Sequence, residues 1–403
     1  MSSFIKTSRD LLVFFGTALL CLQASALVAA EDQVERIFEV EPGGTLYIES
    51  DPGAIEVNSW DQERVRIRAT DADDFDIEME QRGNDVSVIA ERRNGFFNFG
   101  RNNIRFQVDV PTRYNLDLNT SGGGIRVGPI SGDVYADTSG GSIEIDEVTG
   151  GDVEVDTSGG RIRIGNVDGS VIADTSGGSI NIGNVTGYVE ADTSGGSITI
   201  GDVGGDITAD TSGGGIDVGR SGGRVELDTS GGTIRAGWAE GPISVDTSGG
   251  NIFLAGSAVR VEADTSGGNI EVERSGGAVY ADTSGGSITI RQAVGPIRAD
   301  TAGGRIDAEL IAYDGDRDAT IELETAGGDI VLRIPANHRA SVLADVEVNR
   351  SGRGRYSIES DFPLAIEEDS RGNILGRGDI NGGGDIIYLE TTNSNIRIVS
   401  LGN

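Results

Sequence analysis

The chain has 403 residues and a formal net charge of −33, and Lys6 is its only lysine, so nearly all of its cationic side chains are arginines. This acidity disfavours nucleic acid and anionic membranes as partners, whereas divalent cations and basic proteins are compatible with it. Cys21 is the single cysteine, which excludes a disulfide within the chain.

Residues 1–30 are typical of a secretory signal peptide. Lys6 and Arg9 precede an apolar run over residues 11–22, and small residues follow up to Ala30. Cleavage after Ala26 or Ala30 would leave a chain that begins in an acidic stretch. Because the run is too short to span a membrane, we expect an exported protein that is periplasmic, cell-surface or extracellular, with no transmembrane segment in the mature chain.

Residues 31–118 alternate apolar and polar side chains, as in the stretches 45–49, 65–68 and 106–110. Alternation with period two predicts strands, and we interpret this segment as an N-terminal β lead-in that caps a longer array. The aromatic residues Phe96, Phe97 and Phe99 fit a packed loop of this cap.

Residues 119–333 contain a repeated pentapeptide, Asp-Thr-Ser-Gly-Gly, with a constant spacing of 18 residues from Asp156 to Asp300. A fixed period of this kind is the signature of a solenoid. Counting the degenerate copies at Asn119, Asp300 and Glu324, the sequence contains twelve units. Stacked at about 4.8 Å per unit, they predict a rod roughly 58 Å long.

Within the unit 192–209, apolar residues recur two apart, at Ile198 and Ile200 and again at Ile207 and Ala209, with Val203 between the pairs. This pattern predicts short inward-facing strands, and no segment has helical spacing. The sequence therefore predicts an all-β fold, a single-stranded parallel β-helix or solenoid with 18-residue coils. We expect the glycines to supply the positive φ of tight corners.

Continuing the alternation from Ile207 places Thr211 and Gly213 inward and Asp210 and Ser212 outward. The aspartates of the repeat should then form one exposed file. Neighbouring unit charges about 4.8 Å apart in water repel by roughly 0.9 kcal/mol, so something must offset the repulsion. These candidate residues are Asp137, Asp156, Asp174, Asp192, Asp210, Asp228, Asp246, Asp264, Asp282 and Asp300.

Two offsets fit the pattern. Each carboxylate could accept backbone N–H groups of the Ser-Gly turn that follows, as in an Asx turn. Alternatively, the file could collect cations, with calcium as the natural candidate for carboxylate ligands. The ligand spacing of calcium-binding β-rolls is absent, so we favour the turn cap. No cofactor is predicted.

Residues 334–403 are expected to form C-terminal coils and a cap. A strand ends at Pro335, a longer excursion covers residues 345–385, and apolar alternation resumes at 387–389 and 396–398. A solenoid needs such covers because an open edge invites end-to-end pairing.

Hydrolase chemistry finds little support. Residues 219–223 match the Gly-x-Ser-x-Gly elbow around Ser221, but that motif needs a strand-to-helix turn and a histidine. The repeat already explains these glycines, and His338 is the only histidine. We therefore predict that the protein is not an enzyme, with a polysaccharide-active β-helix as the enzymatic alternative.

Several stretches together are similar to a known family: the lead-in over 38–57, the Val110-Pro111 step, the Thr-Ser-Gly-Gly-x-Ile coils and the closing stretch 387–396. They resemble the bacterial "putative adhesin" domain of unknown function, which is related to head domains of auto-transporter adhesins. The resemblance implies a β-solenoid and supplies no catalytic residues. Asn395 departs from the glycine-aspartate step usual in such endings.

We expect an exported, non-enzymatic β-solenoid that acts as an adhesin or cell-envelope scaffold and presents a repetitive acidic surface. Weak contacts that add along a rod suit a repetitive partner, such as a polysaccharide, a cell surface or an envelope protein. The alternative is a calcium-binding solenoid module.

Overall fold

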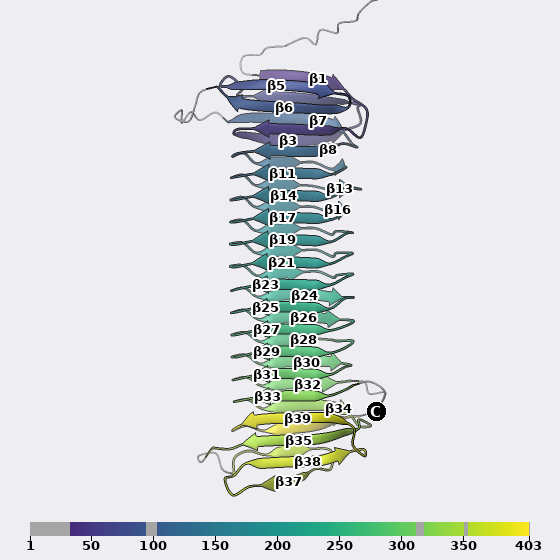
Figure 1. Cartoon of the computed structure of the whole chain (residues 1–403), viewed down its shortest axis with the longest axis vertical. Coiled ribbons are helices and arrows are strands. Elements are labelled where there is room, and N and C mark those ends of the chain that lie inside the picture. The colour runs from purple at the N-terminus through teal and green to yellow at the C-terminus, as the bar shows by residue number, and fades with distance from the viewer. Residues whose placement is uncertain (1–32, 94–102, 312–317, 350–353, 403) are drawn as a thin grey trace, which may run out of the picture.

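The computed structural model describes residues 33–93, 103–311, 318–349 and 354–402. The predicted signal peptide and the aromatic residues Phe96, Phe97 and Phe99 lie outside these ranges. The described residues form strands and turns with no helix, so the all-β solenoid predicted from the repeat is correct. They stack into a long rod (Figure 1).

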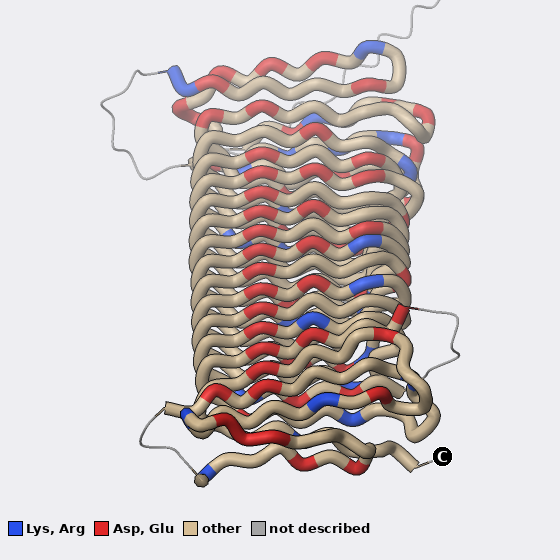
Figure 2. Tube along the Cα trace, turned by 60° about the horizontal axis from the view of Figure 1, so that its bottom comes forward, with Lys and Arg blue, Asp and Glu red and all other residues tan. Residues whose placement is uncertain are grey.

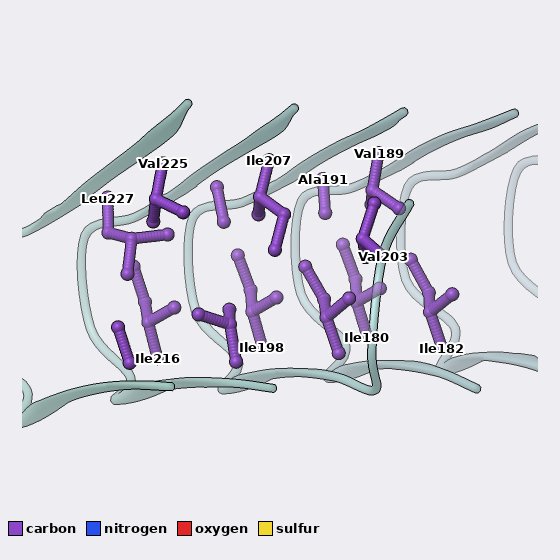
Figure 3. Close-up of a cluster of buried hydrophobic side chains, with 14 of the residues drawn as sticks. Ile180, Ile182, Val189, Ala191, Ile198, Val203, Ile207, Ile216, Val225 and Leu227 are labelled. Atoms are coloured by element: carbon purple, nitrogen blue, oxygen red, sulfur yellow. The ribbon is translucent and has the colours of Figure 1, made fainter. Parts of the chain in front are cut away.

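Each coil of the rod contributes one strand to each of two long sheets, because an apolar pair with period two occurs twice per repeat. In the coil after Asp192, Ile198 and Ile200 face inward from one sheet and Ile207 and Ala209 from the other, each at most 3% exposed. Val203 lies between them and is also buried. Figure 3 shows Ile198, Val203 and Ile207 meeting between the two sheets. The core predicted from the sequence is confirmed.

We call sheet B the sheet whose strands, in the repeats, end at the Asp-Thr of the pentapeptide. Its strands are β2 (Thr45–Ser50), β5 (Phe75–Arg82), β6 (Asp85–Arg92), β8 (Asn115–Thr120), β11 (Val134–Thr138), β14 (Val153–Thr157), β17 (Val171–Thr175), β19 (Val189–Thr193), β21 (Ile207–Thr211), β23 (Val225–Thr229), β25 (Ile243–Thr247), β27 (Val261–Thr265), β29 (Val279–Thr283), β31 (Ile297–Thr301), β33 (Ile321–Thr325), β35 (Ala340–Glu347), β37 (Ala365–Glu368), β38 (Ile374–Ile380) and β39 (Asp385–Thr392).

We call sheet A the sheet whose strands, in the repeats, come directly after the pentapeptide in the chain. Its strands are β1 (Gln33–Glu39), β3 (Gly53–Trp60), β4 (Arg64–Thr70), β7 (Ile104–Pro111), β9 (Ile125–Val127), β12 (Ile143–Ile145), β15 (Ile162–Ile164), β18 (Ile180–Ile182), β20 (Ile198–Ile200), β22 (Ile216–Val218), β24 (Ile234–Ala239), β26 (Ile252–Ser257), β28 (Ile270–Val272), β30 (Ile288–Ala293), β32 (Ile306–Leu310), β34 (Ile330–Pro335), β36 (Ile358–Ser360) and β40 (Ile396–Leu401).

A third, shorter ladder closes each coil between the two sheets. It begins with β10 (Ile130–Ser131), β13 (Val148–Thr149) and β16 (Val167–Asp168). Single parallel bridges continue it through Val185, Val203 and Ser221. The coil is therefore a flattened loop with two wide faces and one narrow one.

Successive coils pair in parallel and in register, so equivalent residues stack one above another. Val189 pairs with Ile207 and Asp192 with Asp210, one repeat apart, and the same register holds along the array. At both ends the pairing becomes antiparallel, in β1–β4–β7 and β5–β6 at one end and in β35–β38–β37 at the other. These antiparallel strands are the caps.

The end coils are interleaved, which the sequence order does not reveal. β2 pairs with both β6 and β8, so the chain leaves its first coil, builds the cap, and returns on the other side. Likewise β39 lies between β33 and β35, and β40 pairs with both β34 and β36. The inward position that Thr holds in each repeat is occupied by Ser50 at the N-terminal end and by Thr391 at the C-terminal end. The column of these residues therefore extends one coil further at each end than the twelve units counted in the sequence.

The glycines of the pentapeptide allow the backbones of adjacent coils to approach closely. The prediction that they supply positive φ is wrong. None of them has a positive φ among the described residues. A Cβ on the second glycine would instead fall within about 2 Å of the carbonyl oxygen of the same glycine one coil earlier, as at Gly214, where it would lie 2.0 Å from Gly196 O. The strand also ends at Thr211, so Gly213 is exposed and not inward as predicted.

Candidate functional site: the acidic face of sheet B

The last residues of each sheet B strand position the aspartates of the repeat. In β21, Ile207, Ala209 and Thr211 are buried, and Asp210 between them points outward. Because side chains alternate across a strand, the same order in every coil puts Asp on the outer face and Thr in the core. The outward orientation predicted for Asp210 and Ser212 is confirmed.

The predicted aspartates share one register position and form a single file along the rod (Figure 2). The file continues at its C-terminal end through Glu324, Glu390 and Asp345. Glu390 and Asp345 are out of chain order in this file, because β39 inserts before β35. The residues of the file that the sequence predicted are Asp137, Asp156, Asp174, Asp192, Asp210, Asp228, Asp246, Asp264, Asp282 and Asp300.

A second acidic column stands two residues before the first, and the sequence reading missed it. From Glu154 to Glu262, every second coil carries glutamate there, at Glu154, Glu190, Glu226 and Glu262, and Arg298 ends the series. The signal was present in the sequence as a 36-residue superperiod, twice the 18-residue repeat. The two columns together make this face strongly negative (Figure 2).

The predicted turn cap by the aspartates is wrong, because the neighbouring threonine makes it. Thr211 Oγ1 donates to Gly196 O of the preceding coil at 2.8 Å and accepts from Gly214 N at 3.3 Å. Equivalent pairs recur along the array with donor distances of 2.7–3.0 Å. The threonines, buried and fully bonded, thus stitch the coils together.

Asx-type bonding does occur, but at other corners and between coils. Asn184 Oδ1 accepts from Asp202 N at 2.9 Å, and Asp202 Oδ1 accepts from Arg220 N at 2.8 Å, each one repeat later. Within the described ranges, no hydrogen bond or ion pair engages the carboxylates of the ten-residue file. Their mutual repulsion is therefore not relieved by any direct partner, although the charge of Arg298 acts on Asp300 at the C-terminal end of the file.

The electrostatics of the file follow from this lack of partners. Partial burial, and then the neighbouring Asp282 and Asp246, raise the pKa of Asp264 to about 6. Burial followed by adjacent carboxylates also raises the pKa values of Asp192, Asp210 and Asp228. The face consequently favours the uptake of protons or other cations.

A shallow hollow runs along the file from Asp156 to Ser248, with a volume of about 480 Å³. Aspartate, threonine and serine residues of successive coils line it, so its wall repeats with the coil. Among the residues placed by the structure, no group of three or more His, Cys, Asp or Glu side chains could hold a metal ion. The carboxylates stand in a line rather than around a point, and calcium binding by the file stays a prediction.

The hydrolase-like motif is part of the core. Ser221 is 3% exposed, and its Oγ donates to Gly205 O at 2.8 Å and accepts from Gly223 N at 3.0 Å. It occupies the inward position that Val203 holds one coil earlier. His338 is also buried, after β34, where burial lowers its pKa. The structure does not bring these two residues together in a common site.

Comparison with known proteins agrees with this architecture. Residues 45–232 match the family model Toastrack DUF4097, a domain of unknown function. Over just under half of its length, the chain is thus similar to this family. A search of curated proteins gave no match.

Two solved structures resemble the chain at low identity. One is a "putative cell adhesion protein" from Clostridium sporogenes, with 8% identity over 92% of this chain and 100% of that one, and a TM-score of 0.16. The other is a "putative lipid binding protein" from Parabacteroides distasonis, with 11% identity over 69% of this chain and 97% of that one, and a TM-score of 0.20. With scores this low, neither description transfers to this chain. Among the described residues, no helix is long and apolar enough to span a membrane.

Proposed function

We propose that the protein is an exported, non-enzymatic β-solenoid that serves as an adhesin or cell-envelope scaffold by presenting a repetitive acidic surface. The observation that carries this proposal is the in-register file of aspartates on sheet B, whose carboxylates have no intramolecular partner. A file without structural partners is available to an external one.

The repetition of the surface supports a repetitive partner. Each coil offers the same Asp and Ser groups in the same orientation, about 4.8 Å from the next. Contacts that are individually weak add along such an array when the partner also repeats. A polysaccharide, a cell surface or an envelope protein has this property, whereas the negative charge disfavours nucleic acid.

The regular coils support a binding role over catalysis. From Asp156 to Asp300 the repeat has no insertion, and active-site clefts in repeat folds are usually built from irregular loops. Ser221 is sequestered in the core, and His338 is buried in the C-terminal region. The enzymatic alternative, a polysaccharide-active β-helix, predicts release of reducing ends from polysaccharide substrates. We expect no such release.

A coil-deletion series tests the proposed function. Removing residues 192–209 deletes one complete repeat and joins Ala191 to Asp210, which preserves both sheets. We expect the fraction that co-sediments with isolated cell envelopes or insoluble polysaccharide to fall stepwise as one, two and three coils are removed. Circular dichroism confirms that each variant retains its strands.

A charge variant separates surface chemistry from length. Asp192→Asn, Asp210→Asn and Asp228→Asn combined keep all coils but neutralise three positions of the file, and we expect weaker sedimentation than for the unaltered chain. Sedimentation that is independent of coil number, or absent with every surface, would overturn the proposal.

N-terminal sequencing of the exported protein should find Leu27 or Glu31 as the first residue.

The second candidate function is a calcium-dependent module, which the unpaired carboxylates favour. It predicts a rise of many degrees in the Tm of the chain with millimolar calcium relative to chelator. Sodium chloride of equal ionic strength is the control, since screening alone would raise the Tm equally in both salts. An equal rise of the Tm in both salts would exclude the calcium-dependent module and leave adhesion or scaffolding as the function.

A further inference from the structure

A second hollow lies on the outer face of sheet B, nearer the N-terminal end than the aspartate groove. Its volume is about 390 Å³, and three exposed tyrosines line it, Tyr47, Tyr135 and Tyr188. They are 45%, 38% and 47% exposed, although tyrosine rings are large enough to gain from burial. The hollow with these half-exposed rings is here called the tyrosine groove.

The register of the strands orders the groove as an alternation of rings and acids. In one outward column, Tyr47 pairs with Asp117, Asp117 with Tyr135, and Tyr135 with Glu154. The column continues through Ile172 to Glu190. At about 4.8 Å per strand, the carboxylates of this column therefore recur every ~9.6 Å, with an aromatic or apolar side chain between them.

Beside this column, the chain places Tyr188 at the position before β19. Its backbone N–H donates to Ser170 Oγ at 3.4 Å, so Tyr188 continues the line of residues that runs from Asn115 through Asp133 and Asp152. The ring of Tyr188 thus flanks the groove at its far end.

All charged side chains that line the groove are acidic. The seven sheet B strands β2, β8, β11, β14, β17, β19 and β21, and the residue before each of them, contain no lysine or arginine. The nearest arginines in sheet B lie in the N-terminal cap, at Arg82 of β5 and Arg92 of β6, and toward the C-terminal end the first is Arg224, before β23. Burial, and then Asp137, Glu154, Asp117 and Asp156, raise the pKa of Tyr135, which reflects this field. Asp117 accepts a hydrogen bond from Asn119 Nδ2 at 2.7 Å, so Asp117 is held in place.

We propose that the tyrosine groove binds an extended basic segment of a partner protein, with lysine or arginine side chains lying against the tyrosine rings and pairing with Asp117, Glu154 and Glu190. An aromatic ring next to a carboxylate attracts a cation through both the ring face and the charge. Charge complementarity excludes acidic partners from the same surface.

The spacing of the groove also selects the conformation of the segment. A polyproline II helix has three residues per turn and a rise of 3.1 Å per residue, so every third side chain recurs at about 9.3 Å. That repeat matches the ~9.6 Å between carboxylates, whereas a β-strand repeats at about 6.8 Å. The groove therefore fits a segment with lysine or arginine at every third position.

This inference rests on the proposed function, because it names one class of partner for the same acidic face. Its test uses fluorescence anisotropy of a labelled peptide made of repeated Lys-Pro-Pro triplets with the full chain. The matched control peptide has the same composition with all its lysines contiguous. We expect the triplet peptide to bind at least several-fold more tightly, and its affinity to fall as salt increases.

Two surface substitutions locate the binding. We expect Tyr135→Ala and Glu154→Gln each to weaken binding of the triplet peptide about 3- to 10-fold. Tyr280→Ala and Glu226→Gln are the matched controls, since they lie in the same column outside the groove and should leave the affinity unchanged. All four side chains are exposed, so the Tm of each variant should stay near that of the parent.

The outcomes separate this inference from the proposed function. If both peptides bind equally, or if the groove variants bind as the control variants do, the inference is wrong, and envelope binding that depends on coil number still stands. If instead a neutral soluble glucan binds and Tyr135→Ala abolishes that binding, the occupant is a glycan and the basic segment is excluded. Triplet binding without any envelope binding would overturn the proposed function alone.

Discussion

The hydroxyl of Thr211 donates a hydrogen bond of 2.8 Å to the carbonyl oxygen of Gly196, which lies one coil earlier. The same hydroxyl accepts from Gly214 N within its own corner. One buried side chain therefore fixes the turn and joins two coils, and its repetition explains why threonine follows aspartate in unit after unit.

Replacing this threonine should destabilise the rod. Thr211→Val keeps the shape of the side chain but leaves the Gly196 carbonyl without its buried donor, which costs about 1–3 kcal/mol. Urea denaturation followed by circular dichroism measures the loss. Ser212→Ala is the control, because Ser212 is exposed and we expect a change within about 0.5 kcal/mol. Equal effects of the two substitutions would contradict the stitching role of Thr211.

The two glycines of each pentapeptide should differ in their tolerance of alanine. A Cβ at Gly232 would lie 1.9 Å from Gly214 O, whereas one at Gly231 would lie no closer than 3.7 Å to any atom. We expect Gly232→Ala to cost about 3 kcal/mol through overpacking against backbone, and Gly231→Ala to be nearly neutral. Thermal melts of both variants compare them directly, and similar Tm values would show that close approach is not the constraint.

Acidification should stabilise this protein. Carboxylates with raised pKa values bind protons more readily in the folded chain than in the unfolded one, so the free energy of unfolding increases as pH falls through the folded pKa. For Asp264 the free energy of unfolding increases as the pH falls from about 6, the pKa in the folded chain, to 3.8, the ordinary pKa of the group. His338 opposes this trend, because burial lowers its pKa and its protonation favours unfolding.

A single substitution isolates the contribution of the file. Asp264→Asn removes one charge between Asp246 and Asp282, and we expect a higher Tm at pH 7 and a smaller gain between pH 7 and pH 4.5 than in the parent. Asp318→Asn is the control, because hydrogen bonds from Thr320 lower the pKa of Asp318 and its removal should have the opposite sign. A Tm of the parent that falls steadily from pH 7 to pH 4.5 would refute the account.

The interleaved C-terminal end should control self-association. Truncation after Gly384 removes β39 and β40, which uncovers the edges of β33 and β34 and takes away the parallel partner of β35. We expect this variant to assemble end to end, because unpaired strand edges recruit other edges. Sedimentation velocity detects the polymers. Truncation after Leu401 leaves these pairings intact and should remain unassembled.

The repeat was informative because each of its features has a local cause. The alternation of Ile198, Ile200, Ile207 and Ala209 identifies buried faces whatever the neighbours are. Hence the all-β solenoid, the inward core and the outward file of aspartates were all predictable. The side chain that caps the turn was not predictable. Asp210 and Thr211 compete for the same turn N–H group, and only the distances between coils decide which side chain reaches it.

The sequence by itself determined the coil length, the inward-facing residues of each coil and the sign of the surface charge, since these depend on periodicity and composition along one repeat. Only the tertiary structure decided how coils pack on one another. It revealed the glycine contacts between coils, the insertion of β39 between β33 and β35, and the alternation of Tyr135 with Asp117 and Glu154. Each of these joins residues that are a whole coil or more apart, and their proximity arises only when the chain is wound.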